Sequence, residues 1–124
     1  MKIKHWAAIV GGMIALGAVC CILTCAFNPA RRTDSDIRDE VLRYTPLGTE
    51  GDQVCKQVTR RFRDARVMHA FTETGWANKS IHANYGVYQS WSNFPWATVV
   101  DISWVFDDEG KLKSVSVERY VDSI

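Results

Sequence analysis

The stretch VVDISWVFDDEGKLKSVSVERYV, residues 99–121, alternates apolar and polar side chains on either side of a short turn sequence. In its first half Asp101 and Ser103 point to one strand face, and the apolar set on the other face is Val100, Ile102, Trp104 and Phe106. The DDEG sequence that follows predicts a tight turn in which Gly110 takes the left-handed conformation. The stretch therefore predicts a β-hairpin.

The second half of this hairpin predicts a less regular strand. Val115, Val117 and Val121 share one face, but Leu112 is out of phase with them, so we expect a β-bulge near Lys113 or Ser114. A hairpin alone is only marginally stable in water. Two weaker strand patterns upstream can complete the sheet: RVMHAF at 66–71, and SIHANYGVY at 80–88, in which Ile81, Ala83 and Tyr85 alternate.

Two amphipathic helices are predicted before these strands. The first, at 34–44, has Asp34 or Ser35 as its N-cap, and its apolar face is Ile37, Val41 and Tyr44. In the second, Thr49 and Asp52 have the spacing of a capping box, and the apolar stripe is Val54, Val58 and Phe62. We expect this stripe to pack on the inward face of the hairpin.

The N-terminus predicts a membrane anchor. After the basic head MKIKH, the 22 residues from Trp6 to Phe27 carry no charge. At about 1.5 Å per residue, a helix of that length crosses the roughly 30 Å hydrocarbon core. A secretory signal has a shorter apolar region of about 7–15 residues, although the small residues around Ala26 also permit cleavage there. We interpret 1–27 as a signal-anchor, 28–33 as a linker and 34–124 as an extracytoplasmic domain.

The predicted fold class is thus α+β: an N-terminal transmembrane helix, followed by two helices packed on one face of a three- or four-stranded antiparallel sheet. Cationic residues on the two sides of the apolar segment nearly balance, with Lys2 and Lys4 before it and Arg31, Arg32, Arg38 and Arg43 after it. A very short basic tail before a long apolar run favours the N-terminus inside. We therefore expect a single-pass protein of the bacterial inner (cytoplasmic) membrane, with a periplasmic C-terminal domain.

Composition and motifs exclude several function classes. Removing residues 1–27 takes away Lys2 and Lys4 alone, so the remainder carries 13 of the 15 Lys and Arg against all 14 Asp and Glu. This balance argues against a nucleic-acid binder. Cys55 is the single cysteine after residue 27, so no internal disulfide is expected there. His69, His82 and Cys55 lack the spacing of a zinc motif, and there is no Gly-x-Ser-x-Gly or phosphate-loop sequence. We expect no catalytic residue, metal, cofactor or small-molecule substrate.

Two groups of residues are candidates for contact with a partner. The first is the basic run Arg60, Arg61, Arg63 and Arg66, which is either a solvated helix end or a contact for an anionic partner. The second is the aromatic set Trp91, Phe94 and Trp96. These three rings cannot all point inward around the sequence SNFP, because Pro95 marks a sheet edge or an exit from it. We expect at least one exposed ring, Trp91 first, on a partner-binding surface.

The sequences YTPLGT, IHANYGVY and VDISWVFDDEGKLKSVSVERYVD together resemble an uncharacterised family of short bacterial membrane-anchored proteins, over residues 36–124. At the level of fold, the order helix, helix, antiparallel sheet, with the FDDEGKL hairpin, resembles the SmpA/OmlA lipoproteins and β-lactamase-inhibitor-like domains. Those are binding modules and not enzymes. The chain lacks a credible lipid-modified cysteine, so only the architecture is carried over.

The function we expect is therefore a membrane-tethered module that binds a protein or peptide, with another envelope protein as its partner. An immunity-type or inhibitor protein is a narrower alternative, and a small enzyme is a third.

Overall fold

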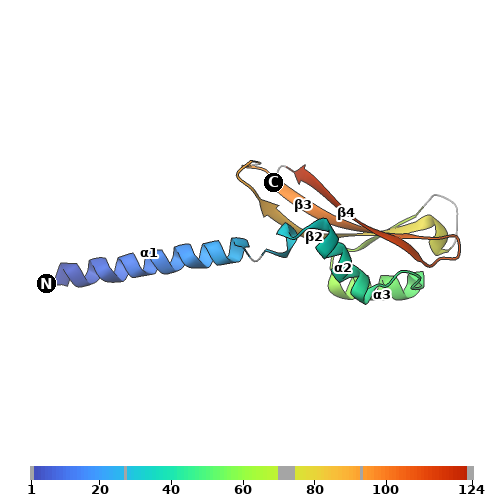
Figure 1. Cartoon of the computed structure of the whole chain (residues 1–124), viewed down its shortest axis with the longest axis horizontal. Helices are drawn as coiled ribbons and strands as arrows, with labels where there is room; N and C mark the ends of the chain where they lie inside the picture. Colours follow the sequence, from blue (N-terminus) through green and yellow to red (C-terminus); the bar gives the residue numbers. More distant parts are fainter. Residues whose placement is uncertain (1, 27, 70–74, 93, 123–124) are drawn as a thin grey trace. The chain divides into compact units, whose positions relative to one another are not determined.

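The computed structural model describes residues 2–26, 28–69, 75–92 and 94–122. The chain divides into two compact units, Met1–Arg31 and Arg32–Ile124. Each unit is described by itself. In Figure 1 the colours follow the sequence, from blue in the N-terminal helix to red in the last strand.

The first unit is an apolar helix with a short continuation. Helix α1 spans Lys2–Ala26 and is followed by the 3₁₀ turn η1, Pro29–Arg31. Its apolar side chains, among them Ile3, Trp6 and Leu16, point to all sides of the helix and are exposed. A helix that is apolar all round is typical of a buried or membrane-spanning segment. By length and composition the 20 residues Ile3–Ile22 suffice to cross a membrane, which agrees with the predicted N-terminal apolar helix.

The second unit contains one antiparallel sheet of four strands in the order β1-β2-β3-β4. The strands are β1 Arg66–His69, β2 Lys79–Gln89, β3 Ala97–Phe106 and β4 Leu112–Asp122. Helices α2, Asp34–Tyr44, and α3, Gly51–Arg61, lie together on one side of this sheet (Figure 1). The α+β class predicted from the sequence is confirmed, with four strands.

The core lies between the helices and the sheet. The inward set on β3 is Val100, Ile102, Trp104 and Phe106, all buried as the alternation predicts. Ile37 and Val41 of α2 and Val54 and Val58 of α3 are fully buried against this face. Each such side chain stabilises the fold by about 1.5–3 kcal/mol through burial. The indole of Trp104 donates to Thr45 Oγ1 at 3.2 Å, and that hydroxyl donates to the Val41 carbonyl at 2.8 Å, so the buried polar groups are paired.

The predicted contact of Phe62 with this core is also confirmed. Its ring centroid lies 6.0 Å from that of Trp104 and 6.5 Å from that of Tyr85. Phe62 is only partly buried, however, because α3 has already ended at Arg61 and Phe62 is its C-cap residue.

The bulge predicted in β4 is present. Val105 pairs with Ser114 and Phe106 with Leu112, which leaves Lys113 as the additional residue. Its presence turns Leu112 inward, where it is buried. In the turn between β3 and β4, Gly110 has a φ of +77°, as expected. A second irregularity lies in β2 between Asn84 and Gly86.

Both helices form as predicted, but their predicted N-cap residues are wrong. Helix α2 is capped by Thr33, whose Oγ1 accepts from the Asp36 amide at 3.2 Å, and not by Asp34 or Ser35. Helix α3 begins at Gly51 without a side-chain cap, so the capping box is absent. Thr49 Oγ1 instead donates to the Pro46 carbonyl at 2.6 Å.

The start of α3 is held by the hairpin. The Gly51 amide donates to the Gly110 carbonyl at 2.9 Å, and the Leu112 amide donates to the Thr49 carbonyl at 2.8 Å. Asp52, assigned to the capping box, accepts from the indole of Trp76 at 2.8 Å. Tertiary hydrogen bonds therefore replace the local cap at this helix end.

Candidate functional site

The connection between β2 and β3 carries three exposed aromatic side chains, two of which are the most exposed among the second unit's described residues. Trp91 is 98% exposed, Phe94 68% and Trp96 47%. Strand alternation ends at Gln89 and resumes at Ala97, so the rings between these residues have no inward face to occupy. Exposure of this set, with Trp91 foremost, is confirmed. Its role in binding a partner stays a prediction.

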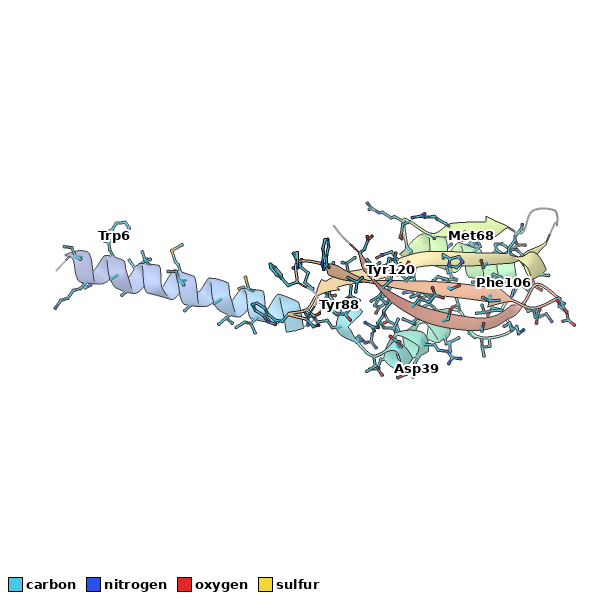
Figure 2. All side chains as sticks on the ribbon, turned by 90° about the horizontal axis from the view of Figure 1, so that it is seen from above. Trp6, Asp39, Met68, Tyr88, Phe106 and Tyr120 are labelled. Carbon is cyan, nitrogen blue, oxygen red and sulfur yellow. The ribbon has the colours of Figure 1, made fainter. Side chains whose placement is uncertain are left out.

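Strand register brings further exposed apolar residues to the same end of the sheet. Val87 pairs with Val99, and Val99 pairs with Tyr120. Figure 2 shows Tyr88 and Tyr120 toward one end of the sheet and Phe106 toward the other. We call this region the aromatic end, and it consists of Val87, Trp91, Phe94, Trp96, Tyr120 and Val121.

Val121 shares a strand face with Val115, as predicted, but it is not buried there. By register it lies on the helix-covered face, yet it is 54% exposed, whereas Val115 is buried. The intervening position on this face is Arg119, which pairs with Val100 across the ladder. Apolar packing therefore gives way to a polar contact before the strand ends.

That contact joins the start of the second unit to the aromatic end. The Arg119 guanidinium lies 2.5 Å from the Asp34 carboxylate and donates to the Arg32 carbonyl at 2.5 Å and to the Tyr88 hydroxyl at 3.2 Å. Charge-assisted bonds of this kind are stronger than neutral ones. As a result, Arg32 and Asp34 lie beside Tyr88, three residues before Trp91.

Tyr120 is the titratable member of the aromatic end. Its hydrogen bond to Asp101, together with the loss of some solvation, raises the pKa of the Tyr120 hydroxyl above its ordinary value. Tyr120 therefore presents an uncharged phenol at neutral pH. Its ring stays nearly half exposed, on the sheet face away from the helices.

The basic residues lie elsewhere. Arg60 and Arg61 are in the last turn of α3, Arg63 follows in a turn and Arg66 begins β1, and all four are exposed. We call this set the basic end. Arg66 pairs with His82, which lies seven residues before Gln89 on β2. At about 3.3 Å per residue, the basic end is roughly 20 Å along the strand from the aromatic end.

One of these cations has an intramolecular role. The Arg61 guanidinium carbon lies 4.0 Å from the centroid of the Tyr44 ring, a cation–π contact. Burial raises the pKa of Tyr44 to about 12, against the opposing effect of the Arg61 charge. Part of the basic run thus covers a helix surface, as the prediction of a solvated helix end allows.

Cys55 and His82, two of the residues considered for zinc, are not brought together. Cys55 lies on α3, whereas His82 lies on the face of the sheet away from the helices, with its Nε2 2.9 Å from Ser80 Oγ. The side chain of His69 is outside the described part of the structure. Among the described residues, no group of three His, Cys, Asp or Glu side chains could hold a metal ion.

The sequence did not indicate that Tyr120 and Val121 contribute to the aromatic end, or that Arg119 joins this end to the start of the domain. Their strand pattern was regular, and only the register places them beside the loop that carries Trp91. No family model, curated protein or solved structure matches this chain.

Proposed function

We propose that this chain is a membrane-anchored binding module. Helix α1 holds it in the bilayer, and the α+β unit binds another protein or a peptide of the cell envelope. The observation that carries the proposal is an apolar helix of sufficient length, joined to a separately compact unit with large apolar side chains exposed both at its aromatic end and on the open sheet face, where Met68 and Val105 lie. Exposed apolar side chains gathered in one region mark surfaces that bind proteins or membranes.

We further propose that the membrane is the cytoplasmic membrane of a bacterium and that the domain lies outside it. The short basic head with Lys2 and Lys4, directly before the apolar segment, supports this orientation. A C-terminal alkaline phosphatase fusion tests it, because this enzyme is active only after export. An inactive fusion together with a fluorescent C-terminal green fluorescent protein would reverse the orientation.

Binding to a protein is tested by photo-crosslinking in intact cells. A photoreactive amino acid replaces Trp91 at the aromatic end, Met68 on the open sheet face or Arg60 at the basic end, since all three are exposed. We expect one of these positions to give a reproducible crosslinked protein band, and the exposed Asp39 on α2 serves as the matched control. If no position crosslinks a protein above the Asp39 control, the chain is not a protein-binding module.

Anchoring is tested separately by extraction of membranes at alkaline pH. An integral helix stays with the lipid under these conditions, whereas a peripheral protein is released. Release of the chain would contradict the anchor without bearing on the crosslinks.

A further inference from the structure

We propose that the aromatic end seats in the lipid–water interface of the same membrane that holds α1. The occupant of this surface is then the bilayer itself, and the protein ligand binds elsewhere on the domain. The inference rests on the proposed anchoring by α1 and goes beyond it by assigning the exposed rings a lipid partner.

The tether from α1 enters the second unit close to the exposed aromatic rings. Arg119 holds Arg32 and Asp34 beside Tyr88, so the second unit begins at its aromatic end. Only five residues separate Ala26, the last residue of α1, from Arg32. A chain spans at most about 3.3–3.6 Å per residue, so Arg32, where the domain begins beside Tyr88, lies within about 20 Å of Ala26.

The exposed apolar side chains of the second unit are unevenly distributed. Among the described residues of the second unit, nine large apolar side chains are exposed. Six belong to the aromatic end, and the other three are Leu47, Met68 and Val105. Apolar exposure is therefore concentrated at the end that the tether keeps near the membrane.

Several side chains of the aromatic end combine an apolar ring with a polar group. Tryptophan and tyrosine are enriched at membrane interfaces because an apolar ring and a polar N–H or O–H suit the boundary between lipid and water. Trp91, Trp96 and Tyr120 have this character, and the hydroxyls of Ser90 and Ser92 flank Trp91. Phe94 adds a fully apolar ring.

The charges of Arg32 and Arg119 are balanced within the domain. Arg119 pairs with Asp34 and Arg32 pairs with Glu40, so these cations are neutralised within the domain. The basic end is roughly 20 Å away along β2, beyond the screening length of about 8 Å at physiological salt. Binding of the aromatic end should therefore depend on its rings and not on anionic lipid.

The test uses the full chain in phosphatidylcholine vesicles, with and without phosphatidylglycerol, and measures tryptophan emission with brominated lipids as quenchers. In the parent chain, Trp6 in α1 reports insertion of the helix. In a second chain, Trp6→Phe removes this signal, so that the emission comes from the tryptophans of the domain. Trp104 is buried, and Trp76 contacts Phe106 with ring centroids 5.1 Å apart, at the opposite end of the sheet. These two residues are built-in controls.

We expect brominated lipid to quench the domain emission in the Trp6→Phe chain, equally with both lipid compositions and at high salt. The additional change Trp91→Ala should remove most of this quenching, while Trp76→Phe leaves it unchanged. An unaltered far-ultraviolet circular dichroism spectrum confirms that each variant is folded.

Three outcomes would overturn the inference. In the first, Trp91 is quenched by aqueous iodide and not by lipid. In the second, photo-crosslinking at Trp91 yields a protein, which would return the aromatic end to protein binding and leave the proposed function intact. In the third, Trp6 of the parent chain escapes lipid quenching, which would remove the anchor and with it both proposals.

Discussion

Gly51 is the residue at which the fold leaves no space for a side chain. A Cβ added there would lie 2.0 Å from Cγ of the Trp76 indole. The ring is held in place by its hydrogen bond to Asp52, by contact with Phe106 and by Lys79, whose Nζ lies 5.2 Å from the ring centroid. Glycine is required here for close approach, because the indole packs directly on the first residue of α3.

We therefore predict that Gly51→Ala destabilises the domain by about 1–3 kcal/mol, the usual cost of overpacking. The measurement is urea unfolding of the full chain in detergent micelles, followed by near-ultraviolet circular dichroism. In a Trp76→Ala background the same substitution should cost much less, since the obstructing ring is gone. Equal costs in the two backgrounds would show that the indole is not the cause.

At the scale of elements, the apolar stripe of α3 decreases in burial from its start to its end. Val54 and Val58 are completely buried, but Phe62 lies past the last helical turn and is partly exposed. The four-residue spacing of these side chains identified the stripe correctly. It could not indicate that the helix ends before its third member.

Truncation of Phe62 should consequently cost less than a full core deletion. We predict that Phe62→Ala lowers the free energy of unfolding by about 2–3 kcal/mol, compared with about 3–5 for a fully buried ring. Urea unfolding provides the value, and Leu47→Ala, at an exposed turn position, serves as the control with a change of about 0.5 kcal/mol or less. A cost as small as that of the control would mean that the ring does not support Trp104.

In strand β4, too, the periodicity of the sequence predicts which side chains face inward but not which of them are buried. Its alternation predicted the face of Val115, and its phase change predicted a bulge near Lys113 or Ser114, which the structure has at Lys113. The alternation continues unchanged to Val121, but the helices that cover this face of the sheet do not bury Val121. Whether an inward-facing position is buried depends on how far the packed helices extend over the sheet. The sequence of the strand itself does not indicate that distance.

At the scale of the whole molecule, the two compact units make a further prediction. Apart from Ala30, the buried apolar side chains that form the core lie on elements of the second unit. Removal of residues 1–26 should therefore leave a folded domain with the urea midpoint of the full chain. A lowered midpoint, measured for both chains in the same detergent, would show that α1 contributes to the stability of the domain.

The aromatic end is a property of the whole molecule and not of one element. Its rings come from the β2–β3 connection, its valines and tyrosine come from the ends of β2 and β4, and Arg119 joins it to the start of the domain. The proposed lipid contact depends on this assembly, because the tether and the rings reach the same end only after the sheet has formed.

Four features could be derived from the order of residues in the chain: the apolar helix, the α+β class, the inward faces of the hairpin and the exposure of the loop with Trp91. Each of these follows from interactions between residues that are close in the chain: periodicity, turn chemistry and the failure of alternation around Pro95. The start of α3, the exposure of Val121 and the place of Arg32 beside Tyr88 were decided by the tertiary structure alone. They depend on hydrogen bonds and packing between residues as far apart as Arg32 and Arg119, which are brought together by strand register and have no local signal in the sequence.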